Sequence, residues 1–307
     1  MYKSVIGLKE RIHFVGIGGI GMSGLAQVMS SVGYKVQGSD ISYSKNIERC
    51  RKIGIKIFSN HNKNNIANCT IVVKSSAIKN NNPEILEAKK KKLIILKRSE
   101  MLAHVVSLKK NIVITGSHGK TTTTSLISKI FSEAKLDPTI INGGVINSLK
   151  GSAKLGRGDW AILEADESDG SFLTLPINYS VVTNIDKEHI DFYKSFKNLK
   201  KSFEKFLNKT PGIGKSFICA DDNELKKIVS KINKKNFLTY GFSKNANFKI
   251  FNSIYKKEYS QYDLKISIPG SKKIIIKKIK LNLIGKHNVL NSVAAISLSL
   301  HIGIKIK

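Results

Sequence analysis

Short apolar runs alternate with amphipathic segments along the first hundred residues. Runs rich in valine, isoleucine and phenylalanine predict strands at 11–16, 35–39, 55–58, 70–73 and 93–96. The segments between them predict helices at 22–32, 46–52, 83–91 and 98–106. Strands that alternate with helices form a parallel sheet with helical crossovers. We therefore expect residues 1–108 to fold as one parallel-sheet domain that ends at the polar break formed by Lys109, Lys110 and Asn111.

The rest of the chain repeats this alternation and then changes character. Apolar runs predict strands at 112–114, 138–141, 160–164, 179–183, 216–220 and 236–240, with helices at 120–134, 195–208 and 222–232. Residues 247–280 contain turn signals between runs that predict antiparallel strands, and an apolar helix is predicted at 288–301. We expect residues 109–303 to form a second α/β domain with a small antiparallel β portion.

Length and composition agree with two globular domains. The chain has 307 residues, of which 41% are hydrophobic, enough for two cores. No run approaches the ~18 apolar residues that span a membrane, and the start of the chain lacks the apolar core of a signal peptide. The three cysteines, Cys50, Cys69 and Cys219, match no disulfide or metal-binding pattern. We expect a cytoplasmic location and no association with membranes.

The formal net charge of +30 favours anionic partners. A basic surface is typical of nucleic-acid-binding proteins. Here, however, the excess is nearly all lysine, it is spread over the whole chain, and it accompanies abundant isoleucine and asparagine, which share A/T-rich codons with lysine. No set of aromatic residues for base stacking lies among the lysines. We therefore expect no functional nucleic-acid binding, although the charge should draw anionic substrates inward.

The segment from Ile112 to Thr124 joins an apolar strand, a glycine loop and a helix start. Backbone N–H groups and a helix N-terminus at such a turn favour phosphate oxygens. Lys120 would reach the β- and γ-phosphates of a nucleotide, and the Thr121 hydroxyl suits Mg²⁺. The general P-loop pattern has glycine at position 114, where this chain has isoleucine. A Gly-Lys-Thr tripeptide also arises by chance, but the flanking strand and helix favour a P-loop-type ATPase domain.

A second glycine turn lies near the N-terminus. Gly16, Gly18 and Gly21 match G-x-G-x-x-G between a predicted strand and helix, and Asp40 ends the next strand. The pattern indicates a Rossmann-like domain that binds a diphosphate next to a ribose. A dinucleotide and a nucleotide-sugar satisfy it equally well. The alternative is a glycine turn that serves packing only.

Acidic residues gather after the strand at 160–164. The run Glu164-Ala165-Asp166-Glu167-Ser168-Asp169 contains four carboxylates, at the end of a strand where open α/β sheets bind ligands. Mg²⁺ takes one or two carboxylates together with phosphate oxygens and water. Glu164, at the strand end itself, is our first choice as a ligand. The alternative is a solvated acidic loop.

Another strand, at 179–183, also ends in polar residues. His189 follows it and would bind a second metal ion or orient a phosphate through a ring nitrogen. A single histidine is as often an ordinary surface residue. The spacing leaves both interpretations open.

Taken together, these segments resemble the Mur ligases, the ATP-dependent amide-forming enzymes of peptidoglycan synthesis. The resemblance rests on seven segments in order along the chain, namely His13 to Ala26, Gly38 to Asp40, Ser75 to Ile78, Gly116 to Thr124, Glu164 to Phe172, Thr183 to Ile185 with His189, and Gly285 to Asn291. The family commonly has threonine where this chain has Ser117, a change that keeps a hydroxyl. Within the family, the segments best match the member that adds L-alanine.

The resemblance implies a role for each matched residue. The implied residues for binding UDP-N-acetylmuramate are Gly16, Gly18, Gly19, Gly21, Met22, Ser23, Asp40, Ser75, Ser76, His118 and Asn142. Of these, His118 and Asn142 would lie closer to the reacting carboxylate. The implied ATP-binding residues are Gly116, Ser117, Gly119, Lys120, Thr121, Thr122, Asn288 and Asn291. Lys120, Glu164 and His189 would be catalytic. Thr121 with Glu164 would hold one Mg²⁺ (or Mn²⁺), and His189 a second.

The implied reaction joins L-alanine to the lactyl carboxylate of UDP-N-acetylmuramate. A carboxylate is a poor electrophile, so ATP first phosphorylates it, and the amine of L-alanine then attacks the acyl phosphate and expels phosphate. The protein's part is positioning and charge neutralisation.

The family also implies a third domain after the helix at 288–301, which supplies contacts to the amino acid and to ATP. This chain has 307 residues, so we expect a truncated chain, or one whose remainder is encoded separately, that binds both nucleotides with little ligation.

Three other interpretations remain open. The first is the sister ligase that attaches a tripeptide to the same UDP-sugar during cell-wall recycling. The second is a binding remnant without turnover. The third is a dinucleotide oxidoreductase, which leaves the Lys120 loop and the acidic cluster unexplained.

Overall fold

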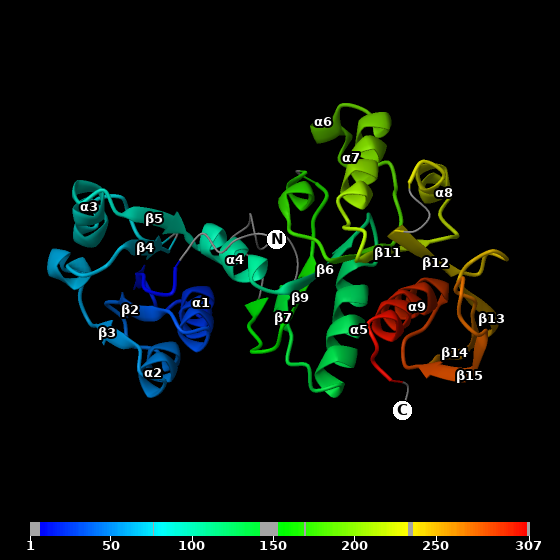
Figure 1. Ribbon diagram of the computed structural model, residues 1–307, viewed down its shortest axis with the longest axis horizontal. Coiled ribbons are helices and arrows are strands. Elements are labelled where there is room, and N and C mark those ends of the chain that lie inside the picture. Colours follow the sequence, from blue (N-terminus) through cyan, green and yellow to red (C-terminus); the bar gives the residue numbers. More distant parts are fainter. Residues whose placement is uncertain (1–6, 76, 142–152, 169, 233–235, 306–307) are drawn as a thin grey trace. The chain divides into compact units, whose positions relative to one another are not determined.

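A computed structural model describes residues 7–75, 77–141, 153–168, 170–232 and 236–305, and the chain divides into two compact units (Figure 1). Unit 1 comprises residues 1–109 and 139–159, and unit 2 comprises residues 110–138 and 160–307. The segment Thr139–Asp159, which we expected in the second domain, thus groups with the first unit. Within this unit, the Lys109 ammonium donates hydrogen bonds to the carbonyls of Gly156 (3.1 Å) and Gly158 (2.6 Å) of this segment.

Unit 1 contains a five-stranded sheet in the order β3-β2-β1-β4-β5, and all of its strand pairs are parallel. The strands are β1 (Arg11–Val15), β2 (Lys35–Ser39), β3 (Lys56–Phe58), β4 (Ile71–Lys74) and β5 (Ile94–Lys97). The connecting segments are α1 (Ile20–Ser31), α2 (Lys45–Lys52), η1 (Lys63–Ile66), α3 (Pro83–Lys90) and α4 (Arg98–Ser107). This order confirms the predicted Rossmann-like domain. The short β7 (Thr139–Ile141) and β8 (Ala153–Lys154) form an antiparallel pair in the same unit.

Local sequence signals explain where the helices of unit 1 begin. The Ser44 hydroxyl accepts a hydrogen bond from the Ile47 N–H at the start of α2, and the Asn82 side chain caps α3 ahead of Pro83 in its first turn. Strand positions with β-branched side chains, such as Val15 and Val72, are buried between the sheet and α3 in one apolar cluster. The core of this unit therefore follows from the apolar pattern of its strands.

Polar side chains form a buried network beside that cluster. The Glu84 carboxylate, at the start of α3, is fully buried and accepts hydrogen bonds from Ser39 (2.6 Å) and Asn65 (2.7 Å). His13 and His61 also contact this carboxylate, at 3.4 and 2.9 Å. Burial alone would raise the pKa of Glu84, but the hydrogen bonds from its neighbours outweigh it and lower that pKa to about 2. The network therefore fixes the end of β2, directly before Asp40.

Acid is expected to destabilise unit 1 through Glu84. The carboxyl has an ordinary pKa of 4.5 and a folded-state pKa of about 2, so the unfolded chain takes up the proton first. The stabilisation is complete above pH 4.5 and is lost as the pH falls towards 2. In urea titrations, the free energy of unfolding of the wild type should fall by about 3 kcal/mol over this pH range because of Glu84. Glu84→Gln should not show this part of the fall. Glu87→Gln on the same helix is the control, and equal pH dependence in wild type and Glu84→Gln would contradict the role of Glu84.

Unit 2 is built on a mixed sheet in the order β15-β14-β13-β12-β11-β10-β6-β9. The strands from β9 to β13 run parallel, and β13, β14 and β15 are antiparallel, as predicted for residues 247–280. The strands are β6 (Lys110–Thr115), β9 (Trp160–Glu164), β10 (Tyr179–Val182), β11 (Lys215–Cys219), β12 (Phe237–Gly241), β13 (Phe248–Tyr255), β14 (Ser260–Ile266) and β15 (Ile274–Leu281). The predicted α/β class with an antiparallel portion is confirmed.

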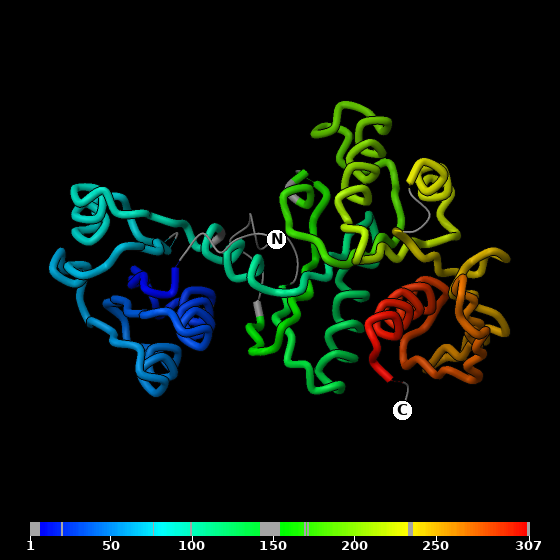
Figure 2. Tube along the Cα trace, in the orientation of Figure 1, coloured from blue at the N-terminus to red at the C-terminus, as the bar shows by residue number. Residues whose placement is uncertain are grey.

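Helices cover both faces of this sheet. They are α5 (Lys120–Glu133), η2 (Ser171–Thr174), α6 (Ile190–Tyr193), α7 (Phe196–Asn208), α8 (Asn223–Val229) and α9 (Lys286–His301). Figure 1 shows α5 and α9 on one face and α7 and α8 on the other. The trace in Figure 2 shows the last helix returning to pack beside α5 and against β11 and β12. Among the described residues, the helices of both units are too short or too polar to cross a membrane.

Candidate functional site

The loop between β6 and α5 has a backbone that requires glycine. Gly116 has φ +131°, and a Cβ there would lie 2.2 Å from the Thr183 hydroxyl and 2.9 Å from the Asn184 carbonyl oxygen. Gly119 has φ +82° and immediately precedes α5. L-residues avoid these backbone conformations. The loop therefore brings its backbone close to neighbouring segments and leads directly into the N-terminus of a helix, where anions bind.

The residues that follow β10 hold this loop in place. The Ser117 N–H donates to the Asn184 carbonyl (3.1 Å), and the His118 N–H donates to the Asn184 side chain (2.8 Å). The Thr183 hydroxyl donates to the His118 carbonyl (2.6 Å), while the Ser117 hydroxyl accepts from the Asp186 N–H (2.8 Å). Sequence reasoning placed Thr183 and Asn184 only in a family motif. The structure gives them a physical task, which is to fix the loop conformation.

Lys120 points back into the loop that precedes it. Its ammonium donates to the carbonyls of Gly116 (2.7 Å) and Ser117 (3.1 Å) and pairs with the carboxylate of Glu167 (2.9 Å). The side chain of Lys120 is 16% exposed and that of Glu167 is 1% exposed. The loop thus places one cation beside the helix N-terminus. Glu167 is a partner that the sequence analysis did not single out within the acidic run.

Thr121 and Glu164 lie together at the first turn of α5. The Thr121 hydroxyl donates to Glu164 Oε1 at 2.8 Å. The other carboxylate oxygen of Glu164 is buried and, within the described residues, has no hydrogen-bond partner. A buried carboxylate oxygen without a partner is costly unless a cation or water satisfies it. A hydroxyl and a carboxylate are oxygen ligands of the kind that Mg²⁺ prefers, so the pair predicted to hold this metal fits it.

His189 lies in a second group of metal-type ligands. Ligand atoms of Asp166, Glu167 and His189 all lie within 4.8 Å of one another, and His189 Nε2 is 3.6 Å from Glu167 Oε1. His189 has φ +56° and precedes α6, a backbone conformation that few non-glycine residues adopt. The structure therefore separates the predicted ligands into two groups, Thr121 with Glu164, and His189 with the acidic residues 166 and 167.

Two predicted ATP-binding asparagines lie on the last helix. A Cβ added to Gly119 would meet the Asn291 side chain at 2.6 Å, so Asn291 lies against the loop. The Asn288 side chain donates to the carbonyl of Ile284 (2.8 Å), which lies just before the start of this helix. The structure thus brings Asn291 to the loop. Thr122 lies in the first turn of α5 beside Thr121.

His118, which we expected near the UDP-sugar, forms ion pairs within unit 2. Its Nε2 lies 2.9 Å from Asp186 Oδ2 and 3.8 Å from Glu188 Oε1, and its side chain is 60% exposed. Neither acidic residue was predicted. Since both follow β10, the segment that holds the loop also orients this imidazole.

The glycine turn of unit 1 is organised by Asp40. The Gly18 N–H donates to Asp40 Oδ2 (2.7 Å), while Oδ1 accepts from the N–H and the hydroxyl of Ser42. Gly16 has φ +79°, and a Cβ there would approach the Ser75 Cβ to 3.0 Å. The turn, Asp40 and Ser75 therefore lie together at the carboxyl ends of β1, β2 and β4. This is where sheets of this kind bind ligands.

The other residues of the predicted UDP-sugar site differ in their burial and in their neighbours. Met22 and Ser23 are each 2% exposed, so their side chains face the interior. Gly19 leads into α1, and a Cβ added to Gly21 would lie 2.7 Å from a guanidinium nitrogen of Arg98. Arg98, the first residue of α4, was missed because it belongs to no recognised motif. Ser76, Asn142 and Asp169 lie outside the described residues.

Two family models match the chain over most of its length. Residues 11–110 match the model "Mur ligase family, catalytic domain", and residues 114–299 match "Mur ligase middle domain". The second match alone covers more than half of the chain. The chain therefore belongs to the Mur ligase family.

Individual relatives show which members of the family this chain is similar to. The chain is 64% identical to a UDP-N-acetylmuramate–L-alanine ligase from Pelagibacter ubique. The alignment covers 96% of this chain and 64% of the relative. The chain is 45% identical to the enzyme of that name from Rickettsia bellii over 97% of its length and 63% of that relative's. The chain thus spans a little under two thirds of the relatives it matches.

Solved structures show the same fold. The structure of UDP-N-acetylmuramate-alanine ligase from Thermotoga maritima superposes with a TM-score of 0.61 and 30% identity, over 96% of this chain and 65% of that one. A UDP-N-acetylmuramate:L-alanyl-gamma-D-glutamyl-meso-diaminopimelate ligase from Neisseria meningitides gives 0.64 at 21% identity, over 96% of this chain and 94% of that one. At that identity the second match supports the fold alone.

Proposed function

We propose that this chain carries the two nucleotide sites of a ligase that joins L-alanine to UDP-N-acetylmuramate. The product of this reaction is a precursor of peptidoglycan. Unit 1 would bind the UDP-sugar at its glycine turn, and unit 2 would bind ATP at the Lys120 loop. The observation that carries the proposal is the pairing of a glycine loop and Lys120 with the Thr121–Glu164 pair at one helix N-terminus. The relatives at 64% and 45% identity bear the name of this activity.

The residues of the loop suit phosphoryl transfer from ATP to a carboxylate. Lys120 and the N-terminus of α5 would neutralise the transferred phosphate, and Asn291 would line the nucleotide beside Gly119. Mg²⁺ held by Thr121 and Glu164 would supply further positive charge, and a second ion beside His189 would use Asp166 and Glu167. The amine of L-alanine then attacks the acyl phosphate and releases phosphate. Positioning and charge carry this chemistry, and it needs no nucleophile from the protein.

The rival assignments make different predictions. The tripeptide ligase shares the ATP machinery, but the solved example at 21% identity supports only the fold, whereas the relatives above favour the alanine-adding reaction. A dinucleotide oxidoreductase would bind NADH or NADPH. Asp40 does not favour it, because both of its carboxylate oxygens already hold the glycine turn and Ser42.

The boundary between residues 108 and 109 and the cytoplasmic location stay predictions.

The direct test is calorimetric binding of UDP-N-acetylmuramate and of ATP with Mg²⁺ to the 307-residue chain. We expect both ligands to bind and neither NADH nor NADPH to bind. Phosphate release is then measured with both nucleotides, with and without L-alanine. Release that requires L-alanine would establish ligation by this chain, and binding without release would support a nucleotide-binding part that needs further residues. A chain that binds NADH or NADPH but not the UDP-sugar would refute the proposal.

Separate replacement of Glu164 and Glu167 by glutamine tests the metal assignment. Glu164→Gln should weaken Mg²⁺-dependent ATP binding by about 10- to 100-fold, because it removes a charged oxygen from the position with the unpartnered atom. Glu167→Gln should have a smaller effect on the metal dependence, since this carboxylate is paired with Lys120. Calorimetry with ATP at several Mg²⁺ concentrations distinguishes the effects of the two substitutions. If only Glu167→Gln abolished the Mg²⁺ dependence, Glu164 would not be the principal ligand.

A further inference from the structure

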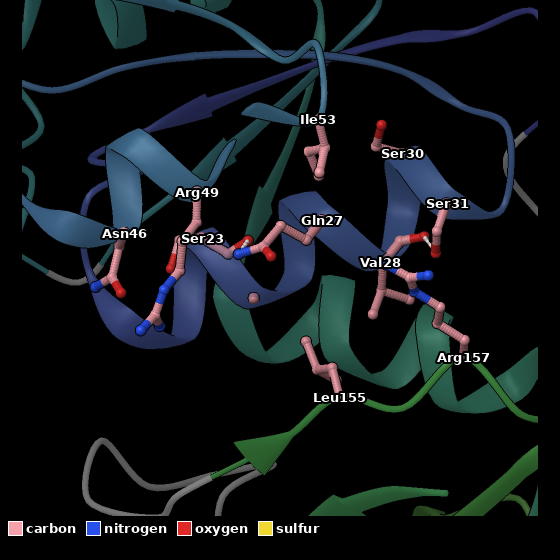
Figure 3. A pocket seen from close by; sticks show the side chains of 11 residues that line it. Ser23, Gln27, Val28, Ser30, Ser31, Asn46, Arg49, Ile53, Leu155 and Arg157 are labelled. Carbon is pink, nitrogen blue, oxygen red and sulfur yellow. Dashed lines mark hydrogen bonds between the residues drawn. The ribbon is translucent and has the colours of Figure 1, made fainter. Parts of the chain in front are cut away.

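An open pocket of unit 1 lies between α1, α2 and the segment after β8. It has a volume of about 500 Å³, within the range of about 300–1,000 Å³ of small-molecule sites. Residues of α1 from Ser23 to Ser31 line one wall, and Asn46 and Arg49 of α2 line another. Leu155 and Arg157, from the segment after β8, complete the lining (Figure 3). The described residues that line it include two arginines and no acidic residue.

The choice of arginine at this pocket is informative. Of the 52 basic residues of the chain, only those at positions 11, 49, 51, 98 and 157 are arginine. Two of the five line this single pocket. Lysine supplies positive charge almost everywhere else, whereas a guanidinium offers a planar fork that binds carboxylate or phosphate in a bidentate manner. Arginine at 49 and 157 therefore points to an anionic ligand.

The two guanidinium groups lie at opposite ends of the pocket. Figure 3 draws Arg49 towards the end of α1 where Ser23 lies and Arg157 towards the end where Ser31 lies. At 1.5 Å per residue, the stretch of α1 from Ser23 to Ser31 is about 12 Å long. Two guanidinium groups placed at opposite ends suit two separate anionic groups better than one. The arrangement therefore fits a ligand with an anionic group at each end.

Neutral polar and apolar side chains lie between the two arginines. Gln27 and Ser30 of α1 contribute an amide and a hydroxyl, the Gln27 amide also donating to the Ser23 carbonyl (3.2 Å), and Figure 3 shows Gln27 in the middle of the pocket. Val28, Ile53 and Leu155 add small apolar surfaces. Such a mixture suits a short hydroxylated carbon chain or sugar, whose hydroxyls bond to polar groups and whose C–H faces contact apolar ones.

We propose that this pocket binds a small, elongated metabolite with a phosphate at each end and a hydroxylated middle. Arg49 and Arg157 each bind one phosphate, and Gln27 bonds to the middle. The site is distinct from the turn at Gly16–Gly21, but Asn46 links the two, since its amide donates to the Gly18 carbonyl (3.0 Å). The proposal does not depend on the ligase assignment.

Calorimetry with fructose 1,6-bisphosphate as the probe tests this site. The wild-type chain should bind the probe, and Arg49→Gln and Arg157→Gln should each weaken binding by about tenfold. Arg51→Gln is the matched control, because Arg51 is an exposed arginine of α2 that does not line the pocket. Fructose 6-phosphate, with one phosphate, should bind about tenfold more weakly than the bisphosphate.

Other phosphate-binding places in the chain provide the remaining controls. Lys120→Ala removes the cation of the ATP loop, and Arg98→Gln removes the guanidinium beside Gly21. Both variants should bind the bisphosphate as the wild type does. The proposal is overturned if either of them loses binding while Arg49→Gln and Arg157→Gln retain it, if both sugar phosphates bind equally, or if millimolar probe gives no binding. Thermal unfolding of each variant shows whether it is folded at the temperature of the binding measurement, which matters most for Lys120→Ala because its ammonium pairs with the buried Glu167.

Discussion

Lys120→Ala is expected to lower the affinity of the chain for ATP by about 10²- to 10³-fold. Its ammonium is held at the N-terminus of α5 by the carbonyls of Gly116 and Ser117, where a nucleotide's phosphates would lie. A cation in a partly buried site contributes far more than one in water, and removing one such group costs about 3–4 kcal/mol. Calorimetry with ATP and Mg²⁺ measures the change. Lys129→Ala, on the same helix but 74% exposed, is the control and should bind ATP normally.

The same substitution has a second effect that a double variant separates. Lys120→Ala leaves the buried Glu167 carboxylate without its lysine, at a cost of about 1–3 kcal/mol in the free energy of unfolding. Adding Glu167→Gln removes the unpaired charge and should recover much of this stability. It should not recover ATP binding. If the double variant regained both, the loss in Lys120→Ala would reflect unfolding rather than a missing phosphate ligand.

Gly116→Ala should destabilise unit 2 by about 3 kcal/mol or more and abolish ATP binding. The new Cβ would lie 2.2 Å from the Thr183 hydroxyl and 2.9 Å from a backbone oxygen, and φ +131° is a conformation that alanine avoids. The loop or the Thr183–Asn184 segment must therefore move. Urea denaturation measures the loss of stability.

Gly212→Ala is the matched control for this substitution. A Cβ at Gly212 meets no atom within 4 Å, and no left-handed φ marks this glycine. Its free energy of unfolding should stay within about 0.5 kcal/mol of the wild type, as for most surface changes. A Gly116→Ala chain as stable as Gly212→Ala would show that the loop adapts, and its close contact with β10 would then be unimportant.

The sequence predicted the helices and strands better than it predicted which distant residues contact one another. Short apolar runs such as Trp160 to Leu163, the first four residues of β9, were readable as strands because both faces of a parallel strand are buried. The glycine patterns at 16–21 and 116–119 are local and so were readable from the sequence. The short turns at η1, η2 and α6 were not predicted, because four-residue helices carry little periodicity.

Contacts between distant segments explain what was missed at the site. Glu167 lay in the acidic run we identified, but only the fold shows that it faces Lys120 whereas Glu164 faces Thr121. Arg98 begins α4, far along the chain from Gly21, and no motif joins the two. The pairing of His118 with Asp186 depends on β6 and β10 being neighbours in the sheet. Strand order, which the sequence did not provide, decides all of these contacts.

The way the Lys120 loop is held also bears on how the protein is made. Asn184, after β10, holds it by hydrogen bonds, and Asn291 of the last helix lies against Gly119. On the ribosome, residues 116–119 therefore emerge long before the segments that fix them. The nascent chain cannot complete this loop until α9 has been synthesised, and such distant contacts form slowly. Nucleotide binding should thus mark the end of folding in unit 2, and ATP cannot guide its earlier steps.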